Sequence, residues 1–277
     1  MTYERISCIM RADDVLPDDR AREVWSIGAY DEIAPFFLPM AGHLVEVAGI
    51  ETGDTVLDIG CGTGNVAITA AQRGAQVSAL DIVPEMLETA RENADVAGIA
   101  TVDWRTGSAT DLPFEDNTFD VTLSCVGHIF AEPATEAAAE LVRVTKTGGT
   151  VAFTSWTPSG VVPAMGARLS AYLPPQPEGF EPPFLWGDPE VVSERLGDSV
   201  LELGFERATI ATPVMSPSHY WHEATRQSGM FIVALELVDE DLREELDRDM
   251  LAAIEPYFDR SRNVVEMEYI ITHATIA

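Results

Sequence analysis

The sequence of 277 residues has little positive charge. It holds 17 basic residues against 46 acidic ones, a formal net charge of −29, and Lys146 is its single lysine. A nucleic-acid-binding surface needs the opposite sign, so we expect no nucleic-acid partner. The acidic residues are spread along the chain, and the hydrophobic fraction of 46% is that of a folded domain. We interpret the charge as a halophilic adaptation, in which salt screens the self-repulsion of an acidic protein.

Cysteines and long apolar runs are also scarce. Cys8, Cys61 and Cys125 lie far apart and form no Cys-x-x-Cys pair, so neither a disulfide framework nor a metal site is expected. No apolar run approaches the roughly 20 residues of a membrane span, and the first residues lack a secretory pattern. We therefore expect a cytoplasmic protein without stable membrane insertion. The sequence leaves the oligomeric state open.

Strand and helix patterns alternate from residue 50 onward, which indicates an α/β fold with a parallel sheet. Apolar runs predict five strands and then two closing strands. The predicted strands are 55–59, 76–80, 101–105, 120–125, 150–155, 207–211 and 268–274. Residues 20–50 have helical spacing, and residues 1–19 are expected to form a mobile arm. Residues 219–258 predict one or two helices.

A glycine-rich turn follows the first of these strands. Gly60, Gly62 and Gly64 alternate between that strand and a helical stretch, so the backbone can turn tightly and a ligand can approach it closely. The spacing is Gly-x-Gly-x-Gly with Asn65 in the next place, not the Gly-x-Gly-x-x-Gly of dinucleotide-binding proteins. Asp81 ends the second strand, where a carboxylate can accept hydrogen bonds from both hydroxyls of a ribose. This arrangement predicts a site for an adenosine-containing ligand.

Two later stretches make the prediction specific. Residues 107–120 contain Leu-Pro-Phe and end on Phe-Asp, and residues 140–149 read Glu-Leu-Val-Arg-Val-Thr-Lys-Thr-Gly-Gly. With Asp58, the glycines and the fourth strand, they resemble the class I S-adenosylmethionine-dependent methyltransferases, in particular small-molecule enzymes similar to the quinone-biosynthesis methylases. The resemblance covers residues 50–155. Ser108 departs from it, because the family usually has an aspartate there at the adenine edge.

The resemblance implies a Rossmann-like, seven-stranded, mostly parallel sheet with a reversed last strand, helices on both faces and a cap over the carboxyl ends of the strands. It implies an S-adenosyl-L-methionine-binding core at 50–155, an N-terminal arm and helices at 1–49 that form part of the acceptor-site cap, and the rest of the sheet at 156–277. We expect cap insertions at about 156–187 and 213–260. The implied cofactor-binding residues are Tyr30, Asp58, Gly60, Cys61, Gly62, Gly64, Asn65, Asp81, Ile82, Met86, Ser108, Ala109 and Cys125.

The chemistry implied by the resemblance is methyl transfer to a small-molecule acceptor. The sulfonium of S-adenosylmethionine is already activated, so the protein mainly aligns the acceptor in line with the methyl group and excludes water. Where the acceptor must lose a proton, His128 after the fourth strand is the candidate general base, and a histidine that only lines the pocket is the alternative.

Two other functions stay open at this point. A nicotinamide-dependent oxidoreductase would also use Asp81, although Asn65 and the Leu-Pro-Phe loop oppose it. A regulatory protein could keep the cofactor pocket without turnover. Residues 156–187 contain too many prolines for a helix or a central strand and too many aromatic residues for a solvated linker. We expect the aromatic rings at 156, 172, 184 or 186 to line the acceptor site.

Overall fold

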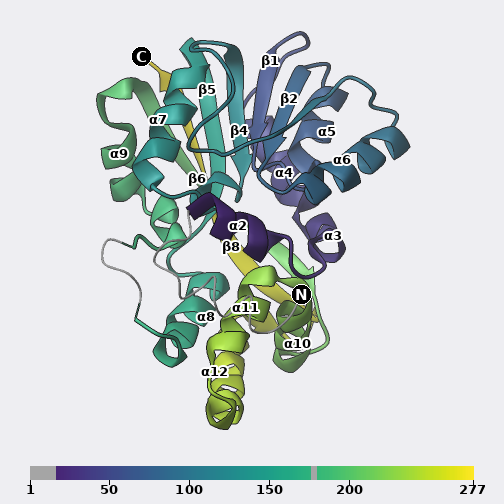
Figure 1. The fold of residues 1–277 in the computed structure, drawn as a ribbon, viewed down its shortest axis with the longest axis vertical. Helices are drawn as coiled ribbons and strands as arrows, with labels where there is room; N and C mark the ends of the chain where they lie inside the picture. Colours follow the sequence, from purple (N-terminus) through teal and green to yellow (C-terminus); the bar gives the residue numbers. More distant parts are fainter. Residues whose placement is uncertain (1–16, 176–179) are drawn as a thin grey trace.

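A single β-sheet forms the centre of the protein, whose computed structural model describes residues 17–175 and 180–277 (Figure 1). The strands stand in the order β3-β2-β1-β4-β5-β8-β6, and β7 pairs with β8 beside this path. Their bounds are β1 Thr55–Ile59, β2 Gln76–Asp81, β3 Asp103–Thr106, β4 Phe119–Cys125, β5 Thr145–Trp156, β6 Val200–Pro213, β7 Phe258–Asp259 and β8 Val264–Ile276. The predicted α/β class is confirmed.

The strand directions also agree with the prediction. Strands β1 to β5 are mutually parallel, and β8 runs antiparallel to both β5 and β6. The reversed last strand therefore lies inside the sheet. The described residues form eight strands where seven were expected, because residues 258 and 259 add the short β7 at the start of β8.

Helices cover both faces of this sheet. The longer ones are α2 Pro17–Trp25, α4 Leu38–Val47, α5 Asn65–Gln72, α6 Pro84–Val96, α7 Ala134–Val144, α8 Val161–Leu169, α9 Pro189–Leu196, α10 Pro217–Gln227, α11 Gly229–Leu237 and α12 Arg243–Ile254. Short helical segments are α3 Tyr30–Ile33, η1 Ala34–Phe37, η2 His128–Phe130, η3 Ser170–Tyr172, η4 Pro183–Gly187, η5 Gly197–Ser199, η6 Glu240–Leu242 and η7 Glu255–Tyr257.

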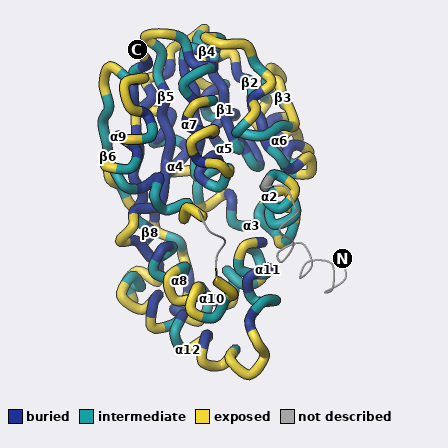
Figure 2. Tube along the Cα trace, turned by 60° about the vertical axis from the view of Figure 1, so that its left-hand side comes forward, coloured by how far each residue is buried: buried dark blue, intermediate teal, exposed yellow. Residues whose placement is uncertain are grey.

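Neighbouring residues of β5 show how the two faces are covered. The hydroxyl of Thr154 donates to the sulfur of Met40 on α4, at 3.3 Å. The ring of Phe153 points the other way, because side chains alternate along a strand, and lies 5.4 Å from the ring of Trp186 on η4. Helices α4 and α5 therefore cover one face, and α7 and α9 cover the other. The strands between these layers form the buried core (Figure 2).

The cap is a separate group of helices beyond the carboxyl ends of the parallel strands. It comprises α8, α10, α11 and α12, and α2 crosses between these helices and the sheet (Figure 1). Its contacts include a hydrogen bond of 2.7 Å from the indole of Trp221 to Asp247 and one of 2.9 Å from the hydroxyl of Tyr172 to Asp249. These bonds join α10 and η3 to α12.

Three predictions about this outer region were wrong or incomplete. Residues 156–187 do contain a helix, α8, because Pro163 lies in its first turn, where the missing N–H has no intrahelical partner to lose. The segment 219–258 holds three helices, which a single apolar pattern did not separate. Helix α2 begins inside the predicted arm, of which residues 1–16 lie outside the described residues.

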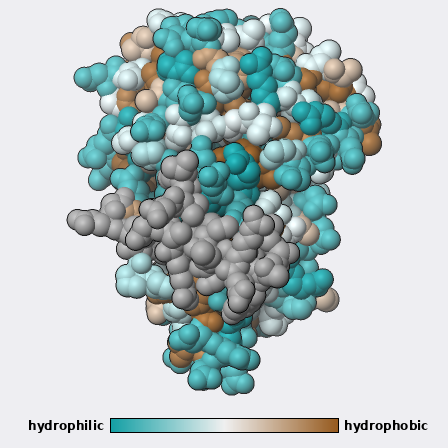
Figure 3. Space-filling view, viewed as in Figure 1, coloured by the Kyte–Doolittle hydropathy of each residue, from teal (hydrophilic) through white to brown (hydrophobic). Residues whose placement is uncertain are grey.

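The surface agrees with the composition. The face of the protein seen in Figure 3 is mainly hydrophilic, with apolar residues scattered over it. Within the described residues, no helix is long and apolar enough to cross a membrane.

Candidate functional site

The glycine-rich turn after β1 is shaped by two close approaches. Gly60 has φ +65°, and a Cβ atom at this position would lie 2.7 Å from the Cα of Gly127, in the turn after β4. Gly62 has φ +51°, and its Cβ would lie 3.3 Å from the ring of Tyr30. Both positions combine a left-handed backbone with a crowded neighbour, so glycine is required there. The turn therefore joins β1, β4 and the N-terminal segment at one point.

Two carboxylates flank this turn, and backbone N–H groups orient both. Asp81 Oδ2 accepts from the N–H of Gly62 at 2.7 Å, and its Oδ1 accepts from the N–H of Val83 at 2.9 Å. Asp58 Oδ2 accepts from the N–H of Ala67, the third residue of α5, at 2.9 Å. The side chains are buried, with exposed fractions of 7% for Asp81 and 1% for Asp58. Two acidic groups are thus held rigidly at the carboxyl edge of β1 and β2.

Burial changes the acidity of these groups. Loss of solvent raises the pKa of Asp58 to about 8, and the nearby Asp81 carboxylate adds to the effect. Burial also raises the pKa of Asp81, although its backbone hydrogen bonds oppose the shift. Asp58 Oδ1 is buried and has no hydrogen-bond partner among the described residues. An unpaired buried oxygen of this kind is costly, so the site is built for a donor that is bound there.

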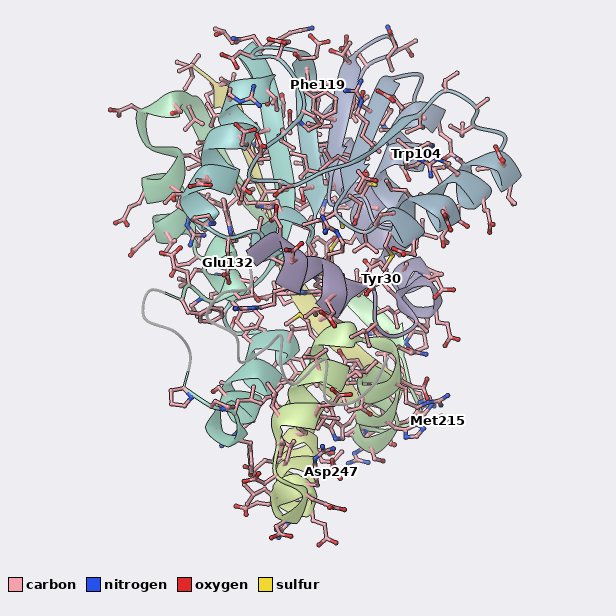
Figure 4. All side chains as sticks on the ribbon, in the orientation of Figure 1. Tyr30, Trp104, Phe119, Glu132, Met215 and Asp247 are labelled. Atoms are coloured by element: carbon pink, nitrogen blue, oxygen red, sulfur yellow. The ribbon has the colours of Figure 1, made fainter. Side chains whose placement is uncertain are left out.

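Tyr30 covers the turn on the side that faces the cap. Figure 4 shows Tyr30 between the sheet and the cap helices. Its ring lies 6.1 Å from that of Trp25, and Trp25 in turn lies 4.8 Å from Phe130 of η2. Burial raises the pKa of the Tyr30 hydroxyl above its usual value, with the acidic groups around it adding to the shift. The tyrosine is therefore neutral and can donate its hydroxyl proton to a ligand.

Helix α2 lies across the loops that follow β2 and β3. Arg22 Nε donates to the backbone oxygen of Ile82 at 3.1 Å. The hydroxyl of Ser108 donates to Asp18 Oδ1 at 3.0 Å. Ile82 and Ser108 are both predicted cofactor-binding residues, so α2 covers this part of the predicted site. Sequence reasoning missed α2 here because residues 1–19 carry no clear hydrophobic period.

The other predicted residues differ in what they contact. Asn65 does not face open space, since its Nδ2 donates to the backbone oxygen of Ala34 at 2.7 Å and so fastens the N-terminal segment to α5. Gly64 ends the turn with φ +91° against the ring of Trp104. Met86 on α6 and Ala109 are half-buried near Ile82 and Ser108 in the chain. The structure therefore brings most of the predicted set to one edge of the sheet.

The two described cysteines, Cys61 and Cys125, have raised pKa values. Burial raises the pKa of Cys125 to about 12, and burial also raises that of Cys61 well above its usual value. The Sγ atom of Cys125 lies 3.5 Å from the hydroxyl oxygen of Thr154. A thiol with a raised pKa is a poor nucleophile, so these side chains serve as packing groups.

His128 follows β4 directly, as predicted, but is fully enclosed. Its exposed fraction is 1%, and its ring lies 4.5 Å from those of Phe153 and Trp186. Burial lowers its pKa to about 3, with Arg195 adding a smaller effect. Neither ring nitrogen has a hydrogen-bond partner among the described residues. The imidazole is therefore neutral at physiological pH.

A hydrogen-bonded array beside the site was missed by sequence reasoning. The hydroxyl of Tyr269 on β8 lies 2.8 Å from His43 Nδ1 on α4, and His43 Nε2 lies 2.9 Å from Glu206 on β6. Tyr269 is opposite Trp156, at the carboxyl end of β5. The three residues are separated by up to 226 positions, so no local pattern could join them. The array ties α4 to β8 and β6.

Metal binding finds no support in the part of the chain that the structure describes. Residues 17–175 and 180–277 contain no group of three or more His, Cys, Asp or Glu side chains that could hold a metal ion.

Comparison with known proteins now decides between the three functions left open. A family model described as a methyltransferase domain matches residues 56–149. The chain is 34% identical to the uncharacterized protein Rv1405c of Mycobacterium tuberculosis, over 91% of this chain and 93% of that relative. It is also 34% identical to the aklanonic acid methyltransferase DauC of Streptomyces sp., over 54% of this chain and 67% of DauC. The chain belongs to the S-adenosylmethionine-dependent methyltransferases.

The fold of this methyltransferase is shared with solved structures. The YcgJ protein of Bacillus subtilis matches it with a TM-score of 0.56 at 17% identity, over 86% of this chain and 98% of YcgJ. The oxidoreductase and the regulatory protein without turnover find no support in these comparisons.

The described site fits S-adenosylmethionine, the cofactor of the family. The unpaired, buried Oδ1 of Asp58 suits the ammonium of the methionine moiety. Each oxygen of Asp81 accepts one backbone N–H and has a further lone pair for a ribose hydroxyl. When bound, the cofactor supplies a methyl group on a positively charged sulfonium. The methyltransferase then has to hold the acceptor in line and keep water out.

Proposed function

We propose that this enzyme methylates a small molecule, which binds between the carboxyl ends of β4 and β5 and the cap. The enclosure of the cofactor edge carries this proposal. Asp58 and Asp81 are buried, Tyr30 lies against Gly62, and α2 crosses the loops after β2 and β3. A polymer would need an open groove, whereas an enclosed site favours a small acceptor. DauC, named for aklanonic acid, makes small organic acids the first acceptors to test.

We further propose the division of labour expected from the sequence. Residues 50–155 hold the cofactor through the predicted contacts, while the N-terminal helices and the insertions at about 156–187 and 213–260 hold the acceptor. Trp156 and Trp186 are buried near the end of β5, and Phe184 packs against Gly166 of α8. Their place between sheet and cap supports a role in the acceptor wall. A cytoplasmic location and the absence of a nucleic-acid partner remain part of this proposal.

His128 is the proposed general base for acceptors that must lose a proton. Its position after β4 and its unpaired ring nitrogens support this role. Its low pKa makes it a weak base, so the role suits acceptors that are themselves acidic. We expect His128→Asn to lower turnover while the affinity for S-adenosylhomocysteine is kept. Normal turnover in the folded fraction, together with a lower melting temperature, would restrict His128 to packing.

The acceptor class can be tested without knowing the acceptor. Purified enzyme is incubated with S-adenosylmethionine carrying a radioactive methyl group and an extract of the source organism, divided by dialysis into small molecules and macromolecules. We expect label in products formed from the small-molecule fraction and much less label with an Asp81→Ala variant, whose affinity for the cofactor is expected to be lower. Label that enters protein or nucleic acid alone would contradict the proposal.

The halophilic interpretation is a separate proposal, supported by the formal charge of −29. Screening shortens from about 30 Å at 0.01 M salt to about 3 Å at 1 M, which relieves repulsion between surface carboxylates. We expect the midpoint of thermal unfolding to rise steeply over this range. A midpoint that stays constant would end this interpretation.

A further inference from the structure

Ser108 is a position where the chain departs from its family, and its hydroxyl already forms hydrogen bonds within the protein. The oxygen accepts from the N–H of Thr110 at 3.2 Å and lies 2.8 Å from the hydroxyl of Thr110. Its own proton points to Asp18 Oδ1, at 3.0 Å. A hydroxyl has one proton and two lone pairs. Ser108 therefore has little capacity left to accept a hydrogen bond from the amino group of an adenine.

Asp18 is held at this same edge of the site. It lies in the first turn of α2, where a negative charge is stabilised by the free N–H groups of the helix. One turn further, Arg22 Nε donates to the backbone oxygen of Ile82 at 3.1 Å. The first contact joins residues 90 positions apart in the chain, and the second joins residues 60 positions apart. Together they fix α2 across the loops after β2 and β3. Both loops contain predicted cofactor-binding residues, Ile82 after β2 and Ser108 at the adenine edge after β3.

The carboxylate of Asp18 has capacity that Ser108 lacks. An ionised carboxylate has two oxygens and about four acceptor sites. Among the described residues, Ser108 is the one side chain that donates to it. The exocyclic amino group of adenine is a donor, and a hydrogen bond from it to a charged acceptor is stronger than one to a neutral hydroxyl.

We propose that Asp18 accepts the hydrogen bond from the adenine amino group of S-adenosylmethionine. Asp18 of α2 thereby replaces the aspartate that the family usually has in the place of Ser108. Ser108 orients the carboxylate of Asp18 through their hydrogen bond. Asp18 is a specificity residue for the cofactor, not a catalytic residue. The inference rests on use of this cofactor, which the family shows, and is independent of the proposed acceptor class.

The test compares two ligands that differ at one position. S-inosylhomocysteine has an oxo group where S-adenosylhomocysteine has the amino group, so it presents an acceptor to Asp18. Titration calorimetry should show that the wild-type protein prefers S-adenosylhomocysteine by roughly 10- to 100-fold, the usual range for a hydrogen bond to a charged group. Asp18→Asn should lose most of this preference, because an amide can also donate to the oxo group.

Asp19→Asn is the matched control. Asp19 is the next residue of α2 and is exposed, and it pairs with Arg22 at 3.1 Å. We expect this variant to keep the full preference. The exchange of both residues, Asp18→Ser with Ser108→Asp, should restore the preference that Asp18→Ser alone removes. Melting temperatures check that each variant is folded.

Two results would overturn the proposal. One is a full preference for S-adenosylhomocysteine in the Asp18→Asn variant. The other is an equal loss of affinity for both ligands, which would show that Asp18 only fastens α2. Acceptor turnover is not measured in this experiment, so its result leaves the proposed acceptor class untouched.

Discussion

Asp81 and Asp18 face the same site from the core and from the N-terminal segment, and they are held in different ways. Asp81 accepts two backbone N–H groups from residues within 19 positions of it. Asp18 is bonded to a side chain 90 positions away. The core therefore shapes its half of the site through local backbone geometry. The N-terminal segment reaches the site through pairs of side chains that only the complete fold brings together.

The first prediction removes the backbone-held carboxylate. Asp81→Ala should weaken binding of S-adenosylhomocysteine by roughly 1.5–3 kcal/mol, since a charged hydrogen-bond partner of the ribose is lost. Titration calorimetry measures the effect. Asp103→Ala is the control, because Asp103 lies on the neighbouring strand β3 but is exposed and paired with Arg105. Equal affinity in the Asp81 variant, with the fold intact, would remove the assignment of the ribose site.

The second prediction concerns the contact between the N-terminal segment and the cap, where α2 packs against α11. A Cβ atom on Gly229 of α11 would lie 1.9 Å from the backbone oxygen of Val24 and 2.7 Å from that of Ile27. Gly229→Ala should therefore displace α2 from α11 and cost about 1–3 kcal/mol of stability, with a loss of cofactor affinity. Thermal unfolding and calorimetry measure both.

The control for this contact is another helical glycine. Gly42 on α4 has nothing within 4 Å of its Cβ position. Gly42→Ala should raise stability by about 0.5–1 kcal/mol, as alanine favours a helix. If Gly229→Ala behaves like Gly42→Ala, the N-terminal segment and the cap are not joined as described.

The third prediction concerns the pH dependence of ligand binding, which we expect to arise from Asp58 in the core. The pKa of Asp58 is raised to about 8, so the empty site is protonated at pH 7, while the ammonium of the ligand favours the carboxylate. Binding of S-adenosylhomocysteine should release a proton, and its affinity should rise by up to about tenfold per pH unit until pH 8. Calorimetry in buffers with different ionisation enthalpies measures the proton.

The raised pKa of Asp58 also makes the stability of the unliganded protein depend on pH. Asp58 keeps its proton in the folded state between about pH 4 and 8, whereas the unfolded chain has released it. The contribution of Asp58 to stability therefore falls as the pH rises through this range. Asp58→Asn should remove both effects. Binding without proton release at pH 7 would contradict the burial of an unpaired carboxyl at this site.

The smallest effect is expected at the array that ties α4 to β8 and β6. Tyr269→Phe removes the hydroxyl that lies 2.8 Å from His43. We expect a loss of about 1 kcal/mol in the free energy of unfolding, the usual value for one hydrogen bond. Denaturant unfolding measures it. The affinity for S-adenosylhomocysteine should stay nearly unchanged in this variant. If Tyr269→Phe lowered that affinity more than Asp81→Ala does, the array would also serve the cofactor site.

The core was largely predictable because its determinants are local. The runs at 55–59 and 76–80 are apolar and end on glycine or aspartate, and the structure has strands at both places. The turn could be recognised from Gly60 and Gly62, because only glycine tolerates the backbone angles and close neighbours at these positions. Asp58 and Asp81 were found because they flank that turn.

The rest of the site could not be predicted for a physical reason. Asp18, His43 and Tyr269 obtain their partners from distant elements, and no periodicity records such a pair. Helix α8 was missed because the prolines of its segment were counted without regard to their position in a turn. His128 was found by its place after β4, but its enclosure depends on Trp186, which a loop brings from 58 positions further along.

The position of β8 in the sheet has a consequence for how the protein folds during its synthesis. This strand holds residues 264–276 and lies between β5 and β6, not at an edge. During synthesis, β5 and β6 therefore have unpaired edges until the residues of β8 have left the ribosome. An exposed strand edge is a template for association with other chains. The nascent protein is thus prone to aggregation until β8 pairs with both strands, and the repulsion between its many negative charges opposes association with neighbouring chains at that stage.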